Sequence, residues 1–346
     1  MSKFTRFINF FRMKKSIAID LGTSNVLIYD KQKKRIVLNE PSILVKDKKT
    51  GEIVAIGTKA KNMLGKTSES LAVIRPLNEG VISDIDATRE MLNIFVKSIY
   101  GGSPFKPEIM ICVPAQVTSI ERRAIFDAAI GAKKIYLIEE GRAAVLGSGV
   151  NISLPEGNTV IDIGGGSTDI AILSLDEIIA SKSIRVAGNN FDNDIIKYVK
   201  KKFDLLIGDK TAENLKKEIG TAMPVVGEEN MTATIKGRDL STGVPKLIEI
   251  NSNQVREAIQ DSIDEIVNAL KEVLEKCPPE LSADILNNGV VLTGGGSLLR
   301  NFDKLIEEKV QIPINRSSNS LESVVMGGGL AFDNKKLMRT LEMREI

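Results

Sequence analysis

A short pattern occurs twice in this sequence, and it constrains the fold more than any other feature. The first copy is IAIDLGTS at residues 17–24, and the second is VIDIGGGST at residues 160–168. Each copy reads as a buried strand with an Asp near its end, then a glycine-rich turn that carries hydroxyl side chains. Two copies 142 positions apart predict a duplicated α/β unit, with the boundary between its halves near residue 150.

Other local signals place elements around these two copies. Residues 109–113 read as a strand that stops at Pro114, and Thr118 with Glu121 forms a capping box that opens a helix to Ala129. Apolar residues at helical spacing predict a long helix over 255–276. The predicted organisation is an N-terminal arm (1–13), a first lobe (14–150, with an insertion at about 42–78), a second lobe (151–335, with an insertion at about 188–250) and a C-terminal tail (336–346).

The composition excludes several classes of protein. The chain has no His, so it has no Ser-His-Asp relay, no His metal ligand and no imidazole proton shuttle. Its 47 Lys and Arg against 45 Asp and Glu give a net charge of +2, which argues against a nucleic-acid binder that works through bulk charge. The two cysteines, Cys112 and Cys277, lie too far apart for a CxxC motif and suit a reducing cytoplasm.

The paired glycine turns can hold a polyphosphate. Glycine lets backbone N–H groups approach phosphate oxygens, and nearby hydroxyls add donors. Asp20 and Asp162 can hold Mg²⁺ through its waters. A third loop, residues 293–296, follows a predicted strand and can pass along a base or an α-phosphate. Nothing in the sequence fits GxxxxGK[ST], and no GxGxxG follows the first strand, which disfavours P-loop and dinucleotide-binding Rossmann sites.

An ordered set of motifs resembles the actin and sugar-kinase superfamily and, within it, the MreB family of bacterial actins. The motifs are DLGTSN (20–25), RPLNEGVISD (75–84), VPAQVTSIERRA (113–124), LIEEGRAA (137–144), DIGGGSTDIAI (162–172), TAENLKKEIG (211–220), TGGGSLL (293–299) and VVMGGGLA (324–331). This resemblance implies an α/β actin-like fold, with two lobes that each contain a ribonuclease-H-like core and an inserted small subdomain. It further implies ATP and Mg²⁺ in the cleft between the lobes, and protomers that assemble into antiparallel double filaments on the inner face of the membrane.

The resemblance also implies roles for individual residues. The nucleotide would be bound by the first loop (Gly22, Thr23, Ser24, Asn25), the second loop (Gly164, Gly165, Gly166, Ser167), the ribose and adenine side (Glu213, Lys216, Lys217) and the third loop (Gly294, Gly295, Gly296). Asp20 and Asp162 would hold Mg²⁺ through water, and catalysis would involve Glu140, which orients the attacking water, with Thr168 and Asp162. The segments 75–84 and 323–330 would connect the lobes, with Gly80 and the glycines at 327–329 as hinges.

The sequence departs from the family pattern beside these residues. Gly141 replaces the usual Pro, and the usual GGGTTE is GGGSTD, with Ser167 for Thr and Asp169 for Glu. A Gly removes a fixed φ and loosens the segment that aims Glu140, and a Ser loses the stiff β-branched rotamer of Thr. Because phosphoryl transfer depends mainly on positioning, both changes predict slow ATP hydrolysis with nucleotide binding retained.

Several functions remain open at this point. The first is a nucleotide-regulated cytoskeletal polymer that determines cell shape, either by guiding wall synthesis or by supporting shape and swimming in a wall-less cell. The alternatives are a sugar or acid kinase of the same superfamily, a chaperone-like ATPase, and a structural filament with negligible hydrolysis. The sequence identifies no partner protein beyond a second copy of the chain.

The N-terminal arm has the pattern of a membrane-binding helix. Its first fifteen residues carry five basic residues and no acid. Phe4, Phe7, Ile8 and Phe11 follow the spacing of one helix face, so an anionic membrane is the expected partner. The resemblance also implies a second membrane contact at the loop formed by residues 100–105. The expected location is the cytoplasm, peripheral at the inner face of the cell membrane.

Overall fold

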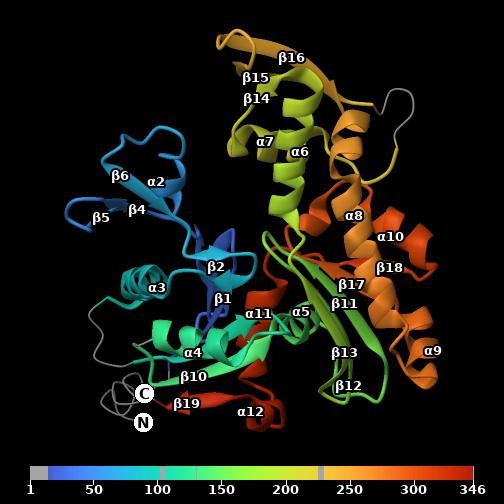
Figure 1. The fold of residues 1–346 in the computed structure, drawn as a ribbon. Helices are drawn as coiled ribbons and strands as arrows, with labels where there is room; N and C mark the ends of the chain where they lie inside the picture. The colour runs from blue at the N-terminus through green and yellow to red at the C-terminus, as the bar shows by residue number, and fades with distance from the viewer. Residues whose placement is uncertain (1–14, 102–105, 130, 225–229, 346) are drawn as a thin grey trace.

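The computed structural model describes residues 15–101, 106–129, 131–224 and 230–345, and two large sheets organise them (Figure 1). The first sheet contains β3 (Arg35–Pro41), β2 (Asn25–Asp30), β1 (Ser16–Leu21), β9 (Glu108–Val113), β10 (Lys134–Glu139) and β19 (Met343–Glu345), in that order. The second contains β13 (Glu177–Ile184), β12 (Thr168–Ser174), β11 (Asn158–Ile163), β17 (Val290–Thr293) and β18 (Ile314–Arg316).

The two sheets repeat one topology, which confirms the predicted duplication. In each, three consecutive strands form an antiparallel meander, and two later strands are added in parallel beside the first strand of that meander. The strands that carry Asp20 and Asp162, β1 and β11, therefore occupy equivalent central positions. This is the ribonuclease-H-like core that was expected for each lobe.

Each half also carries a smaller sheet between its third and fourth strands. In the first half it contains β4 (Leu44–Asp47), β5 (Ile53–Ile56) and β6 (Leu71–Ile74), with the short helix α2 (Thr58–Lys61). In the second half it contains β14 (Leu205–Leu206), β15 (Thr232–Asp239) and β16 (Pro245–Asn251), beside α6 (Gly188–Phe203) and α7 (Asp209–Ile219). Figure 1 shows these small units at the same end of the molecule, beyond the two large sheets.

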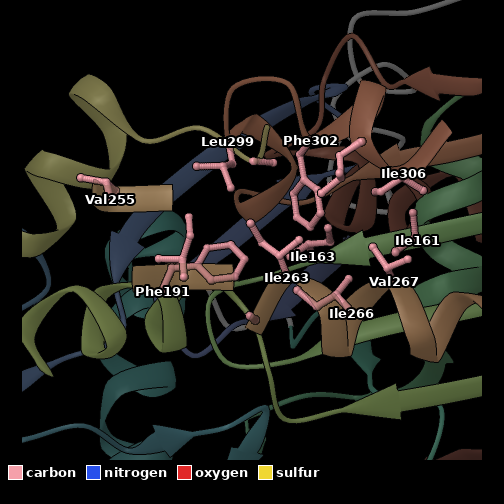
Figure 2. Close-up of a cluster of buried hydrophobic side chains, with 14 of the residues drawn as sticks. Ile161, Ile163, Phe191, Val255, Ile263, Ile266, Val267, Leu299, Phe302 and Ile306 are labelled. Carbon is pink, nitrogen blue, oxygen red and sulfur yellow. The ribbon is translucent and has the colours of Figure 1, made fainter. Parts of the chain in front are cut away.

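Helices cover the large sheets, and the core contains buried residues from both the helices and the strands. The helices are α3 (Ile85–Tyr100), α4 (Ser119–Ala128), α5 (Glu140–Gly147), α8 (Ser252–Leu274), α9 (Pro279–Asn288), α10 (Phe302–Val310), α11 (Ser323–Ala331) and α12 (Leu337–Thr340). A 3₁₀ turn lies at Gly296–Leu298. A short hairpin of β7 (Leu77–Asn78) and β8 (Val81–Ile82) precedes α3. The capping box predicted at Thr118 and Glu121 is present. The apolar stripe predicted for the long helix is buried along α8, where Ile263 and Ile266 pack with Phe302 (Figure 2).

Helices α5 and α11 cross in direct backbone contact, and they join the two halves. A Cβ at Gly147 would overlap the Ser323 carbonyl, and a Cβ at Gly327 would overlap the Ala143 carbonyl. Gly328 and Gly329 meet β-strand side chains of the first sheet in the same way. The segment 323–330 is thus part of a buried helix, α11, whose glycines allow close packing. That these glycines absorb dihedral change between lobe arrangements stays a prediction.

The residues expected to form a C-terminal tail belong to the first lobe. Strand β19 pairs with β10 in antiparallel register, with Tyr136 opposite Met343. Arg122 reaches Glu342 at 2.6 Å, and Arg344 reaches Asp127 at 3.1 Å. The prediction missed this pairing because three residues carry too little pattern to identify a strand.

Candidate functional site

The first glycine loop is the tight turn between β1 and β2. A Cβ at Gly22 would lie 2.7 Å from the carbonyl oxygen of Asn25, so this turn requires glycine. Thr23 Oγ1 accepts a hydrogen bond from the Gly80 backbone N–H at 2.9 Å, which ties the loop to the β7–β8 hairpin. The Asn25 side chain donates to Asn39 within the sheet, so this residue supports the turn.

The second glycine loop joins β11 to β12 and lies against the first. Gly164 N–H donates to Ser167 O at 2.9 Å and closes the turn. A Cβ at Gly165 would overlap Ser24, and a Cβ at Gly166 would overlap Thr23. The structure therefore brings the two predicted phosphate loops into contact, with one loop from each lobe.

The two neighbouring hydroxyls of the second loop differ in orientation. Thr168 is fully buried and donates to the Val186 carbonyl at 2.7 Å, so its proton is already used inside the second lobe. Ser167 faces the first lobe, because a Cβ at Gly80 would lie 2.8 Å from its Oγ. Of the two, Ser167 is the hydroxyl placed to meet a ligand between the lobes, and the catalytic role predicted for Thr168 receives no support from this geometry.

The third loop packs beside the second at the end of β17. Gly294 has φ +84° and would place a Cβ 2.6 Å from Asp162 Oδ1, so both its backbone conformation and its surroundings require glycine. Its N–H donates to Ser320 O at 2.8 Å. Gly296 lies against Ile163, the last residue of β11. The third loop and Asp162 are therefore neighbours.

The residues expected on the ribose and adenine side lie on α7. Glu213 forms ion pairs with Lys217 at 2.6 Å and with Lys61 at 3.2 Å. Burial acts to raise the pKa of Glu213, but the two lysines together outweigh it and hold the pKa below its usual value. Lys216 points toward the second loop: its Nζ is 2.8 Å from Asp192 and donates to Gly188 O, also at 2.8 Å. Gly188 N–H in turn donates to Gly164 O at 3.1 Å.

Four carboxyl groups gather behind the loops. They are Asp20, Glu140, Asp162 and Asp169. Burial raises the pKa of Asp20 to about 7 and raises the pKa of the other three as well, and their mutual repulsion adds to the shift for Glu140 and Asp162. Sequence reasoning gave Asp169 no functional role. Asp169 lies opposite Asp162 in the antiparallel pair β11–β12. A hairpin drawn through the glycine turn would have placed the two side by side and so identified Asp169.

This cluster fits a hydrated cation. Asp162 Oδ1 and Asp169 Oδ2 are buried without a hydrogen-bond partner, which is costly unless a ligand or an ion supplies one. Within the described ranges, no three acidic, His or Cys side chains lie close enough to ligate a metal ion directly. Asp20 and Asp162 therefore suit Mg²⁺ that keeps its own waters.

Glu140 is the first residue of α5, directly after β10. Its neighbour Gly141 is buried against the second lobe, where an added Cβ would lie 2.9 Å from the Ala171 Cβ and 3.6 Å from Val160 Cγ1. Gly141 thus lets α5 approach β12 closely. Gly141 was expected to loosen the segment that aims Glu140. In the structure this segment is instead packed tightly against β12.

Four residues predicted to touch the membrane, Phe4, Phe7, Ile8 and Phe11, lie outside the described residues. So do positions 102–105 of the loop at 100–105, which was also expected to touch lipid. Tyr100, which opens that loop, donates its hydroxyl to Asp30 at 3.1 Å and lies under the ammonium of Lys15. In the part of the chain that the structure describes, no helix combines the length and the apolar character needed to cross a membrane.

The chain is similar to a well-defined group of known proteins. The family model for the MreB/Mbl protein matches residues 14–340. The cell shape-determining protein Mbl of Bacillus subtilis is 45% identical over 323 residues, which cover 92% of this chain and 96% of that protein. The cell shape-determining protein MreB of Escherichia coli is 44% identical over 325 residues, covering 92% of this chain and 93% of that protein.

Solved structures agree on the fold. The crystal structure of MreB 5 of Spiroplasma citri bound to AMPPNP has a TM-score of 0.86 and 37% identity, and the match covers 95% of this chain and 98% of that one. A MamK double helical filament has a TM-score of 0.77 at 20% identity, covering 93% of this chain and 99% of that one, which supports the fold alone. The fold is actin-like, as the sequence predicted, and the chain belongs to the MreB/Mbl family.

Proposed function

We propose that this chain is a cell shape-determining bacterial actin that binds ATP with Mg²⁺ between its lobes, hydrolyses it slowly, and polymerises. One observation carries the proposal: three glycine loops from both lobes meet in front of four carboxyl groups, of which Asp162 and Asp169 are buried and Asp20 and Glu140 are half-buried. Backbone N–H groups and hydroxyls suit phosphate oxygens, while the carboxylates suit the cation that accompanies them. The relatives named as cell shape-determining proteins, and the Spiroplasma citri structures bound to AMPPNP and to ADP, point the same way.

Each group has a proposed part in the reaction. The loops at 22–24 and 164–167 would hold the phosphates, and Gly294 to Gly296 the nucleoside side. Asp20 and Asp162 would hold Mg²⁺ through water, and the ion would neutralise charge on the phosphates. Glu140 would orient the attacking water. Its raised pKa comes from burial first and from Asp169 next, so a bound cation would restore its carboxylate form.

The ends of the second lobe support head-to-tail self-association. At the small-subdomain end, exposed apolar side chains lie with basic ones: Leu206, Leu240, Val244 and Leu247 with Lys200, Lys201, Lys202, Lys236 and Arg238. At the opposite end, near α9 and the β12–β13 turn, exposed apolar side chains lie with acidic ones: Leu154, Leu175, Ile179 and Leu286 with Glu156, Glu177 and Glu280. Figure 1 shows these elements at opposite ends of the lobe. Complementary ends on one chain favour an open, repeating contact.

The filament would be an antiparallel double strand attached to the cytoplasmic face of the cell membrane by the basic, Phe-rich arm at residues 1–13. One arm would bind reversibly, while a filament that displays many arms would bind stably. Co-sedimentation with anionic liposomes tests this step. Full-length protein should sediment with the liposomes and a chain that begins at Lys14 should not. Equal binding by both would refute it.

The nucleotide step has its own test. Glu140→Gln keeps the size of the side chain and removes its charge, so it should retain nucleotide affinity while phosphate release falls tenfold or more, about the effect of losing a positioned base. Isothermal titration and a phosphate-release assay measure the two quantities. An unchanged release rate would remove Glu140 from the mechanism.

A further inference from the structure

Two ion pairs join the small subdomain of the first lobe to helix α7 of the second. Lys61, the last residue of α2, lies 3.2 Å from Glu213 Oε2. Arg75, one residue after β6, lies 3.0 Å from Asp209 Oδ2. The partners are 152 and 134 positions apart in sequence, and each pair joins an element of the first lobe to an element of the second.

The two acids are arranged as a pair of contacts on one face. Asp209 and Glu213 lie four residues apart on α7, and residues at this spacing are neighbours on a helix surface. The two bases approach that face from separate elements of the first lobe. Because there are two contacts, the pairs oppose rotation of one small subdomain against the other as well as separation.

Both sides of this contact are anchored to the nucleotide loops or the large sheets. On the first lobe, Glu40 at the end of β3 accepts hydrogen bonds from the N–H and the hydroxyl of Thr58, both at 2.7 Å, and so fixes the start of α2. On the second lobe, Lys216 ties α7 to Gly188, and Gly188 is bonded to Gly164 in the second glycine loop. A change at the loop can therefore reach the ion pairs through α7.

We propose that Lys61–Glu213 and Arg75–Asp209 form a latch across the mouth of the nucleotide cleft, and that this latch limits the rate at which nucleotide leaves. The inference rests on the proposed nucleotide function and adds its regulation. The side chains are between 24% and 66% exposed, so each pair changes an opening equilibrium by only about 1.5- to 5-fold. Two such pairs slow exchange without preventing it.

The Arg75–Asp209 pair gives the cleaner test, because neither residue is assigned to nucleotide binding. The measurement is the release rate of a fluorescent ADP analogue from the full chain, chased with excess unlabelled ATP. Arg75→Glu and Asp209→Arg each place like charges at the latch and should speed release by about 3- to 10-fold. The double variant restores an opposite-charge pair and should return release to within about twofold of the wild type.

A matched control comes from another ion pair of similar length. Arg316 and Asp303 lie 3.0 Å apart on β18 and α10, within the second lobe, so Arg316→Glu should leave release unchanged. Circular dichroism with urea checks that every variant is folded.

The outcomes separate the two proposals. If the wild type fails to bind the fluorescent nucleotide, the proposed function itself is refuted. If it binds, and both folded single variants release at the wild-type rate, the latch is refuted. Release that stays fast in the double variant would also overturn it, because the effect would then belong to the individual residues and not to the pair.

Discussion

Replacing Asp20 with Asn tests whether the buried carboxyl cluster stores unfavourable charge that only a cation relieves. Burial raises the pKa of Asp20 from 3.8 to about 7, so in the folded, cation-free protein this group holds its proton through weakly acidic conditions. In the unfolded chain it has already lost that proton by pH 5. Titration of Asp20 therefore lowers the stability of the folded state as the pH rises from the unfolded pKa of 3.8 to about 7. Asp20→Asn removes this contribution, while those of Glu140, Asp162 and Asp169, whose pKa values are also raised, remain.

The size of the effect follows from the two pKa values. Between pH 5 and the folded pKa of about 7, the folded state holds about one proton more than the unfolded chain. Each pH unit in this window is worth about 1.4 kcal/mol, so the wild type should lose about 3 kcal/mol relative to Asp20→Asn between pH 5 and pH 8. Below about pH 3.8 the two proteins should show the same pH dependence, because Asp20 is then protonated in both the folded and the unfolded state.

Urea unfolding followed by circular dichroism at pH 5 and pH 8, in the presence of a chelator, gives the two free energies; the chain has no Trp for fluorescence. Asp47→Asn is the matched control. Hydrogen bonds from the backbone N–H groups of Thr50 and Lys49 lower the pKa of Asp47, so its titration lies below this window. ATP with Mg²⁺ should stabilise the wild type more than Asp20→Asn. Equal pH dependence of the two proteins would refute the reasoning.

Three further outcomes follow from the packing. Gly141→Ala should destabilise the protein by about 1–3 kcal/mol, because its Cβ would lie 2.9 Å from the Ala171 Cβ, and adding Ala171→Gly should recover most of the loss in urea unfolding. Gly166→Ala should weaken ATP binding in isothermal titration, because the new Cβ would overlap Thr23 and separate the loops, and unchanged affinity would contradict this. Thr168→Val should reduce stability by about 1 kcal/mol, because it removes the hydrogen bond that Thr168 donates to the part-buried Val186 carbonyl. A stable Thr168→Val that has lost phosphate release would instead return this residue to catalysis.

The sequence was most informative where the signal is local. The strand–Asp–glycine turn at 17–24 and its copy at 160–168 predict two equivalent central strands, and the structure has them in β1 and β11. The capping box at Thr118 and the apolar stripe of α8 were likewise correct, because each depends on residues within a few turns of helix.

Features set by distant partners were not predictable in this way. Strand β19 forms because β10 offers a free edge to it, and its three residues alone do not specify a strand. The choice between Ser167 and Thr168 depends on where the β12 alternation starts, and a shift of one residue reverses which hydroxyl faces the cleft. The cross-lobe pairs Lys61–Glu213 and Arg75–Asp209 require the relative placement of two lobes.

The central claim is that nucleotide between the lobes controls assembly, and electron microscopy of the purified full chain tests it most directly. Samples with ATP and Mg²⁺, with ADP and Mg²⁺, and without nucleotide are imaged at one protein concentration. Because the three glycine loops come from both lobes, phosphate contacts should favour one lobe arrangement over others. The account predicts paired filaments with ATP and Mg²⁺, and few or none without nucleotide. Filaments of equal number and length in all three samples would contradict it.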